Sequence, residues 1–279
     1  MREIPVEIII DAVEHLFIDA NVHLSRNVVD ALEQAIAQEE SVVGKDVLKE
    51  LIRNARIAKE EGLPICQDTG LAVTFIEIGQ DVHITGGYLF DAVSEGVRRA
   101  YRKGYLRKSC CDPFTRKNTG DNTPPIIHTG IVPGETLKIT VMPKGGGSEN
   151  YGEVRMLTPS QGKEGVKTFV VDMVRKGGPN PCPPIIVGVG IGGNLETAAR
   201  LSKEALIVPL GVRNDDAEIA EFERELLNEI NKTGIGPQGY GGTVTALDVH
   251  IKIMPCHIAS LPVAVNMQCH AHRIKEVIL

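Results

Sequence analysis

Several residue types and patterns are scarce in this sequence, and each scarcity excludes a class of protein. The chain of 279 residues has no tryptophan, only 4% aromatic residues and a formal net charge of −6. Nucleic-acid-binding proteins rely on basic clusters and aromatic stacking platforms, so this class is excluded. No apolar run approaches the roughly 18 residues of a membrane span, and the N-terminus is acidic rather than basic. We therefore expect a cytoplasmic chain that does not enter a membrane.

Cysteine, glycine and proline are well represented. Six cysteines in a chain without a secretion signal are expected to be reduced thiols, used in the core or as metal ligands. The 29 glycines and 16 prolines gather in five segments, at 61–70, 142–152, 175–184, 188–194 and 232–242. Because such segments fix tight turns or let the backbone approach a ligand, we expect several loops to converge on one site.

The hydrophobic periodicity predicts helices first and a mixture of strands and helices afterwards. Three helices are expected within residues 1–62, with Ser25 as an N-cap and Gly62 as a C-terminal stop. Strands are then expected at 71–79, 136–144, 184–190, 243–253 and 261–267, and helices at 90–107, 159–178, 194–206 and 215–234. The short connection between the last two strands suits antiparallel neighbours. The predicted fold class is α/β (α+β), with a helical N-terminal region and a mixed sheet flanked by helices.

Three cysteines occupy loops next to predicted strands. Cys66 lies in PICQDTG and is followed directly by Gln67 and Asp68, which is a pattern typical of an active site. Cys182, in PNPCPP, comes just before a strand, and Cys269 comes just after one. If the last strand runs antiparallel to those at 71 and 184, the three thiols share one sheet edge and could bind one metal centre. The alternative, that they are buried core thiols, stays open; the remaining cysteines fit it, namely Cys110, Cys111 and Cys256.

A glycine-rich segment offers a second hypothesis. Gly188, Gly190 and Gly193 match the G-x-G-x-x-G dinucleotide fingerprint, with Asp215 and Asp216 about twenty residues further on. These acidic residues open a predicted helix, however, whereas the fingerprint requires an acidic residue at the end of a second parallel strand. Close packing of the glycines, with an anion at the helix start, is the preferred interpretation.

Three other features have both a functional and an ordinary interpretation. The glycines at 145–147 could present backbone N–H groups to an anion or form a flexible turn. Taken alone, Arg107 is a solvated charge and His257 a hydrogen-bonded core histidine.

Five motifs in order resemble one family. PICQDTG, LRKS, PKGGGSEN, CPP followed by GVGIGGN, and MPCHIASLPVAVNMQCHAHR are similar to the cluster-bearing part of class I iron–sulfur hydro-lyases. This family includes class I fumarate hydratases and L(+)-tartrate dehydratases. The similarity extends from about residue 5 to the end of the chain.

The resemblance implies a cofactor. By this match Cys66, Cys182 and Cys269 hold a [4Fe-4S] cluster whose fourth iron has no protein ligand. Thiolates are suitable ligands for such a cluster, and an open iron can act as a Lewis acid toward a substrate hydroxyl. Cys110, Cys111 and Cys256 have no such role by this match.

The resemblance also implies roles around the substrate. Asp68 is matched to a general acid/base, and His257 to a histidine near the substrate that reaches the site of a neighbouring subunit. The groups matched to the substrate carboxylates are Gln67, Arg107 and the backbone of Gly146 and Gly147.

One departure from the family concerns the chain's extent. Single-chain members continue into a swivelling C-terminal domain that adds arginines, a lysine and a threonine to the site, whereas this sequence ends at HRIKEVIL. We therefore expect residues 1–279 to form one catalytic domain, with a helical subregion at 1–62 and the cluster-binding part at 63–279. The missing domain is expected on a β subunit, in an α2β2-type hetero-oligomer.

The expected reaction is reversible hydration of fumarate to (S)-malate, a C4 dicarboxylate chemistry, with L(+)-tartrate dehydration as the alternative. Two further classes stay open. The three cysteines with His257 or His270 could bind zinc in a hydrolase or a structural site. The glycine-rich segment could bind a nicotinamide cofactor in a dehydrogenase.

Overall fold

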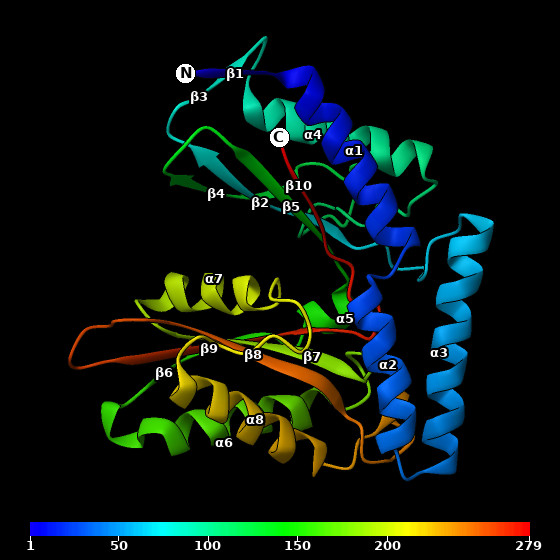
Figure 1. The fold of residues 1–279 in the computed structure, drawn as a ribbon, viewed down its shortest axis with the longest axis vertical. Helices are drawn as coiled ribbons and strands as arrows, with labels where there is room; N and C mark the ends of the chain where they lie inside the picture. The colour runs from blue at the N-terminus through cyan, green and yellow to red at the C-terminus, as the bar shows by residue number, and fades with distance from the viewer. The chain divides into compact units, whose positions relative to one another are not determined.

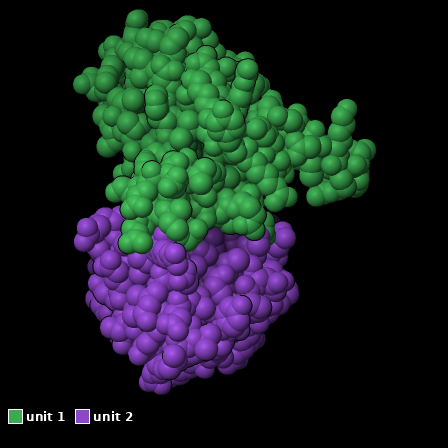
Figure 2. All heavy atoms as spheres, turned by 90° about the vertical axis from the view of Figure 1, so that its right-hand side faces the viewer, with its two compact units in different colours: residues 1–24, 54–146, 273–279 green, residues 25–53, 147–272 purple.

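The computed structural model describes all residues 1–279, which form two compact units (Figure 2). Unit 1 comprises residues 1–24, 54–146 and 273–279, and unit 2 comprises residues 25–53 and 147–272. Both units combine helices with mixed sheets, which confirms the predicted α/β class (Figure 1). None of the helices has the length and apolar character needed to cross a bilayer.

Unit 1 is built on a mixed four-stranded sheet. Its order is β10-β5-β2-β4, with β2 parallel to β4 and antiparallel to β5, and β10 antiparallel to β5. The strands are β2 (Leu71–Gly79), β4 (Ile126–Val132), β5 (Leu137–Lys144) and β10 (Lys275–Ile278). A separate parallel pair is formed by β1 (Arg2–Pro5) and β3 (Val82–Thr85).

Two helices cover the same side of this sheet (Figure 1). They are α1 (Val6–Val22) and α4 (Leu89–Lys103), and their apolar faces share one core with β2 and β5. The helices approach closely at Gly96, where a Cβ would stand only 2.7 Å from the Cβ of Val13. Phe17 and Tyr101 close the other end of this contact, with ring centroids 6.1 Å apart. The core therefore fixes Tyr101 beneath the start of β2.

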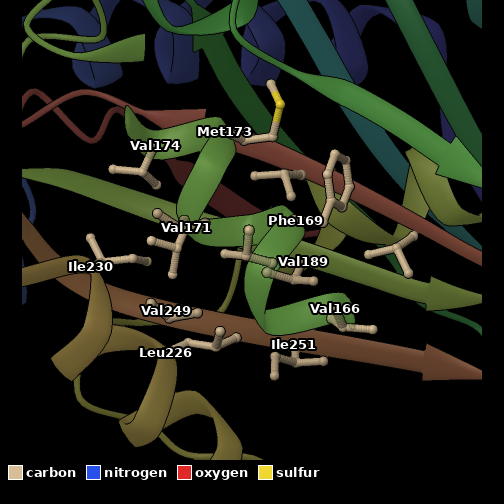
Figure 3. Packing of buried hydrophobic residues seen from close by; sticks show 14 of the residues in the cluster. Val166, Phe169, Val171, Met173, Val174, Val189, Leu226, Ile230, Val249 and Ile251 are labelled. Carbon is tan, nitrogen blue, oxygen red and sulfur yellow. The ribbon is translucent and has the colours of Figure 1, made fainter. Parts of the chain in front are cut away.

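Unit 2 is a three-layer arrangement. Its sheet has the order β6-β9-β7-β8, and β9 runs antiparallel to β6 and β7, whereas β7 is parallel to β8. The strands are β6 (Glu153–Leu157), β7 (Ile185–Gly192), β8 (Ala246–Met254) and β9 (Leu261–Gln268). Helices α6 (Gly162–Gly177) and α8 (Ala217–Asn231) cover one face, and α7 (Leu195–Ala205) covers the other (Figure 1). Apolar side chains from α6, α8 and the sheet fill the larger interlayer space (Figure 3).

The remaining helices are α2 (Arg26–Gln38), α3 (Val42–Glu61) and the short α5 (Gly146–Glu149), together with two 3-10 turns, Pro159–Gln161 and Pro237–Gly239. Ser25 stands at the N-cap of α2, as predicted. Gly62, also as predicted, follows the last residue of α3 and has a φ of +66°, a conformation that glycine adopts without strain.

Two sequence-based expectations about the strands were wrong. The strands divide between separate sheets, so β2, which follows Cys66, is not in the sheet that holds β7 and β9. The last two long strands, β8 and β9, run in opposite directions but are not neighbours, because β7 lies between them. A short loop constrains the direction of two strands more strongly than it constrains their pairing.

The glycines of the G-x-G-x-x-G segment serve packing. A Cβ on Gly188 would stand 2.1 Å from the carbonyl oxygen of Ser202, and one on Gly190 would stand 2.1 Å from that of Ala198. These distances are impossible for any side chain, so glycine is required for α7 to lie on β7. Asp216 caps α8 by accepting the N–H groups of two residues in its first turn. The structure thus explains these residues without a dinucleotide, and the dehydrogenase hypothesis loses its basis.

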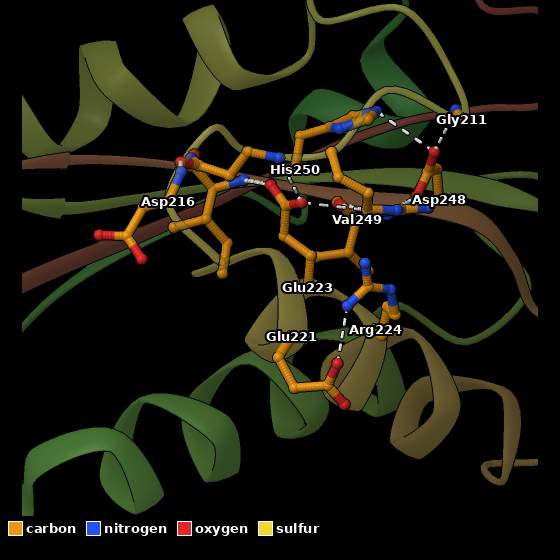
Figure 4. A network of polar contacts seen from close by, with 11 residues as sticks. Gly211, Asp216, Glu221, Glu223, Arg224, Asp248, Val249 and His250 are labelled. Atoms are coloured by element: carbon orange, nitrogen blue, oxygen red, sulfur yellow. Dashed lines mark hydrogen bonds and ion pairs between the residues drawn. The ribbon is translucent and has the colours of Figure 1, made fainter. Parts of the chain in front are cut away.

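Side chains satisfy the backbone groups at the outer edge of β8, which pairs with no further strand (Figure 4). Arg213 donates to the carbonyl of Val249 at 3.2 Å, and Asn214 donates to that of Ile251 at 2.9 Å. The carboxylate of Glu223 accepts the Ile251 N–H at 2.9 Å. An unpaired strand edge is a site for aggregation, and these contacts block it.

The same region contains a buried histidine that makes stability depend on pH. Burial lowers the pKa of His250 below its usual value of 6.5, with Asp248 opposing this shift and Arg213 adding to it. The unfolded chain therefore binds a proton near pH 6.5 that the folded chain does not. Stability from this group is complete above that pH and falls below it, by at most about 1.4 kcal/mol per pH unit.

We expect urea unfolding to show this dependence between pH 7.5 and pH 5.5. In the His250→Gln variant the loss of unfolding free energy over this interval should be smaller than in the wild type by about 1 kcal/mol. Equal losses of unfolding free energy in the wild type and the variant would show that His250 has the same pKa in the folded and the unfolded chain.

Candidate functional site

The Cys66–Gly70 turn of unit 1 leads directly into β2. The Asp68 N–H donates to Cys66 Sγ at 3.4 Å, and the Gly70 N–H donates to Asp68 Oδ1 at 3.0 Å. Gly70 has a φ of +76°, and a Cβ there would stand 2.6 Å from the carbonyl carbon of Lys144. Glycine is thus required at this position, and the turn presents the Cys66 thiol and the Asp68 carboxylate together.

Two buried side chains donate hydrogen bonds to the backbone of this turn. The Tyr101 hydroxyl lies 2.8 Å from the carbonyl of Thr69 and 2.9 Å from that of Gly70. Burial raises the pKa of Tyr101 far above its usual value, so the hydroxyl keeps its proton and donates it to these carbonyls. Asn122 Nδ2 donates to the same Gly70 carbonyl at 3.2 Å. The backbone after Asp68 is therefore rigidly placed.

Gly146, predicted to bind substrate, lies next to Asp68. Its N–H donates to Asp68 Oδ2 at 2.8 Å. The structure therefore brings together the predicted general acid/base and one of the two predicted glycines. Gly147 belongs to unit 2, where a Cβ would stand 2.9 Å from the carbonyl oxygen of Asn180, so this position too requires glycine.

Gln67 and Arg107 have exposed side chains in unit 1. Gln67 Oε1 lies 3.4 Å from Cys66 Sγ. The helix predicted to end near Arg107 ends earlier, at Lys103, because Gly104 stands at its C-cap. The Thr69 hydroxyl then donates to the carbonyl of Arg107 at 2.8 Å, so the Arg107 backbone is tied to the residue that follows Asp68. Cys66, Gln67, Asp68, Arg107 and Gly146 thus belong to one small region.

Unit 2 brings the loops of Cys182 and Cys269 together. Strands β7 and β9 are antiparallel with Ile186 opposite Gln268, so the residue before β7 and the residue after β9 lie at the same end of the sheet. His270, next to Cys269, donates its N–H to the carbonyl of Cys182 at 3.3 Å. The predicted common edge is therefore confirmed for these two cysteines.

Cys182 has an unusual backbone conformation. Its φ is +59°, in the left-handed region that residues other than glycine rarely occupy. Its N–H donates to the carbonyl of Pro179 at 3.0 Å, which closes a turn within the proline-rich loop. Strained residues of this kind gather at functional sites, where the surrounding structure holds them.

His257 lies at the other end of unit 2. It occupies the exposed loop between β8 and β9, beside a groove of about 450 Å³ lined mainly by apolar side chains, and its Nδ1 accepts the Ala259 N–H at 3.1 Å. The eight residues of β9 separate it from Cys269. At about 3.3 Å per residue, this strand spans roughly 26 Å. The fold of unit 2 therefore keeps His257 away from its own Cys182 and Cys269.

The donor chemistry of the three matched cysteines suits an iron–sulfur cluster, because thiolates are its usual ligands. All six cysteines are thiols, and Cys66, Cys182 and Cys269 are partly exposed at loop positions. Neither unit by itself gathers three histidine, cysteine or acidic side chains around one point. His270 Nδ1 faces the Cys182 carbonyl at 3.2 Å and Gln238 Nε2 at 3.1 Å. The imidazole is thus oriented through Nδ1, and the resemblance, not this contact, assigns the three thiols as the ligand set.

Sequence reasoning missed three residues that shape the site. Tyr101 and Asn122 hold the Cys66–Gly70 turn, and Arg273 is buried beneath Asp68. The sequence around Tyr101 indicated only that this residue belongs to the buried face of a helix. Arg273 ends the HAHR part of a matched motif, which was the one available indication.

Comparisons with known proteins identify the family of this chain. The sequence model of the fumarate hydratase (Fumerase) family matches residues 10–278. A protein of Methanocaldococcus jannaschii that bears the name L(+)-tartrate dehydratase subunit alpha only provisionally is 43% identical over 269 residues, covering 94% of each chain. L(+)-tartrate dehydratase subunit alpha of Escherichia coli strain UTI89 is 38% identical over 251 residues, covering 88% of this chain and 82% of that protein. The chain therefore belongs to the fumarate hydratase (Fumerase) family of hydro-lyases.

Proposed function

We propose that this chain is the α subunit of an iron–sulfur hydro-lyase that reversibly hydrates fumarate to (S)-malate. The observation that carries the proposal is the Cys66–Gly70 turn, in which the Asp68 N–H donates to the Cys66 thiol while the Asp68 carboxylate accepts the Gly146 N–H. The chain belongs to the fumarate hydratase family, and the sequence resemblance assigns these residues to its motifs.

In this proposal Cys66, Cys182 and Cys269 hold a [4Fe-4S] cluster. When bound, the cluster supplies an open iron that acts as a Lewis acid toward the substrate hydroxyl. The Asp68 N–H donates to Cys66 Sγ, which fixes the position of this sulfur in the turn. The loops of Cys182 and Cys269 lie at one end of the unit 2 sheet, which supports their joint use.

Asp68 is proposed to move the proton of the hydroxyl group. One carboxylate oxygen accepts the Gly70 N–H and the other accepts the Gly146 N–H, so two backbone donors orient the carboxylate. A carboxylate held this way can take a proton in one direction of the reaction and return it in the other.

The substrate carboxylates are proposed to bind at Gln67, Arg107 and the glycines at 146 and 147. The Arg107 side chain is exposed, its backbone is tied to the turn by the Thr69 hydroxyl, and a planar guanidinium suits bidentate binding of a carboxylate. The Gly146 N–H donates to the Asp68 carboxylate. A substrate oxygen that binds this N–H would therefore also meet the proposed acid/base.

His257 is proposed to act in the site of a second α chain. The length of β9 separates it from Cys269 in its own unit, and its loop is exposed. This requires at least two α chains, and with one β subunit for each the expected assembly is of the α2β2 type. The relatives are named as alpha subunits, which supports the existence of a β partner.

L(+)-tartrate dehydration is the second candidate reaction, because the similar proteins of Methanocaldococcus jannaschii and Escherichia coli bear that name. L-tartrate has one hydroxyl more than malate, and a pocket discriminates weakly against an added hydroxyl unless it is built to bind it.

One preparation tests the proposal. The α chain is co-expressed with a β subunit, purified without oxygen, and assayed with malate and L-tartrate side by side. We expect a brown protein with iron and acid-labile sulfide and turnover of malate. Faster turnover of L-tartrate would favour the second candidate. Colourless protein with stoichiometric zinc, or an α chain that is as active alone as with the β subunit, would contradict the proposal.

A further inference from the structure

Arg273 is a buried arginine that the proposed function does not use. It follows Cys269 by four residues, and only 2% of its surface is exposed. Its Nη1 donates to Asn21 Oδ1 at 3.0 Å and to the main-chain carbonyl of Asp68 at 2.7 Å, and its buried Nε has no partner. Both acceptors are neutral. A buried guanidinium is costly under these conditions, so its location requires an explanation.

The explanation lies in what borders the guanidinium. A Cβ on Gly145 would stand 3.1 Å from Asp68 Oδ2 and 3.5 Å from Arg273 Nη2. The carboxylate and the guanidinium therefore border the same small space, which a glycine leaves open. Both charges also act on the buried Tyr101 hydroxyl. Burial has the largest effect and raises the pKa of Tyr101, while the positive charge of Arg273 lowers it and the negative charge of Asp68 raises it.

Different residues donate to the different backbone carbonyls of the turn. Tyr101 and Asn122 hold the carbonyls of Thr69 and Gly70. The carbonyl of Asp68 accepts its hydrogen bond from Arg273. Asn21, which orients Arg273, is itself fixed within α1, because its Nδ2 donates to the carbonyl of Phe17 at 2.9 Å. A rigid helix thus supports the arginine, and the arginine supports Asp68.

We propose that Arg273 is a positioning residue that fixes the direction in which Asp68 presents its carboxylate. It does so by anchoring the Asp68 carbonyl and by placing a positive charge beside the carboxylate. Without the anchor, the peptide between Asp68 and Thr69 can rotate and carry the carboxylate away from the Gly146 N–H. The inference rests on the proposed role of Asp68, for which a misplacement of about 1 Å can lower the rate by about 10²-fold.

The first test uses the complete αβ enzyme with its cluster. In Arg273→Met we expect kcat per cluster to fall by about 10²-fold, with KM changed by less than about threefold, because the groups that bind the substrate carboxylates stay in place. Arg273→Lys, which can donate to only one of the two oxygens, should recover kcat in part, to about one tenth of the wild-type value. A loss confined to KM, or a kcat per cluster within twofold of the wild type, would overturn the proposal.

Arg213→Lys is the matched control. Arg213 is a mostly buried arginine of unit 2 that pairs with Asp248 at 2.6 Å. Its replacement by lysine weakens a largely buried arginine contact without touching the Asp68 turn, so kcat per cluster should stay within about twofold of the wild type. A parallel loss of kcat in both variants would show a general structural effect and would overturn the specific role of Arg273.

A second measurement needs neither cluster nor substrate. In the cluster-free α chain, the Gly70 and Gly146 amides donate to the Asp68 carboxylate, so their hydrogen exchange reports its position. We expect Arg273→Met to speed exchange at both amides by about tenfold, and to leave the Gly188 amide in the core of unit 2 unchanged. Unchanged exchange at both amides would overturn the proposal even if activity fell.

The two measurements separate the inference from the proposed function. If the wild-type pair hydrates no C4 dicarboxylate, the proposed function fails, and the exchange rates still decide whether Arg273 holds Asp68. If Arg273→Met does not fold, Arg273→Lys decides the question. A loss of kcat per cluster of about tenfold in that variant supports the proposal, and a loss of less than twofold contradicts it.

Discussion

Replacing Asp68 by asparagine is expected to lower kcat of the αβ enzyme by about 10²- to 10⁴-fold, the range that a general acid/base contributes. Asparagine has the size of aspartate, and its carbonyl oxygen can still accept the Gly70 N–H, which lies 3.0 Å from Asp68 Oδ1. The amide nitrogen cannot accept the Gly146 N–H or a substrate proton. The variant thus removes the proton-transfer chemistry while it keeps most of the turn.

The cluster should survive this change. Cys66 keeps its thiol and the N–H of residue 68, so iron and sulfide content and the visible absorption are expected to match the wild type. Steady-state assays with malate, normalised to cluster content, measure the effect. Retention of more than about one tenth of the wild-type kcat would show that another group carries the proton.

Asp112→Asn provides a matched control. Asp112 is also an aspartate in a turn, and its Oδ1 accepts the N–H groups of Phe114 at 3.0 Å and Thr115 at 2.7 Å. It lies in an exposed loop outside the proposed site, so this variant should keep the wild-type kcat. A similar loss in both variants would point to a general effect of removing a charged turn residue.

The parts of the site that the sequence predicted are those with local patterns. Cys66, Gln67 and Asp68 are consecutive, so a single loop fixes their neighbourhood. The shared sheet end of Cys182 and Cys269 followed from strand direction alone, and the antiparallel pairing of β7 and β9 confirms it. The first inference depends on one short stretch of chain, and the second on the relative direction of two strands.

Other features depend on contacts between residues far apart in the sequence. The strand order β6-β9-β7-β8 places β7 between two strands that follow one another in the chain, and no loop length reveals this. Arg273 contacts Asp68 across 205 residues, and Tyr101 contacts Thr69 across 32. A buried arginine has no hydrophobic periodicity, so sequence patterns predict it at the surface. The structure was needed to place these supports beneath Asp68.

The largest expected loss of stability comes from the buried charges at the edge of β8 (Figure 4). Asp248 is 1% exposed, and its carboxylate pairs with Arg213 at 2.6 Å and accepts the Gly211 N–H at 2.7 Å. Replacing Asp248 by alanine leaves the guanidinium of Arg213 without this partner in a mostly buried location. Removing one partner of a buried pair costs about 3 to 5 kcal/mol, and we expect the unfolding free energy of the α chain to fall by this amount.

Glu221→Ala on α8 is the control for this measurement. Glu221 pairs with Arg224 at 2.7 Å, but 70% of the Glu221 side chain and 53% of the Arg224 side chain are exposed. An exposed pair of this kind contributes less than about 1 kcal/mol, so urea unfolding should separate the two variants clearly. A loss below about 1 kcal/mol in Asp248→Ala would mean that water or a new partner compensates Arg213. The β8 edge would then depend on the hydrogen bonds of Asn214 and Glu223 rather than on this ion pair.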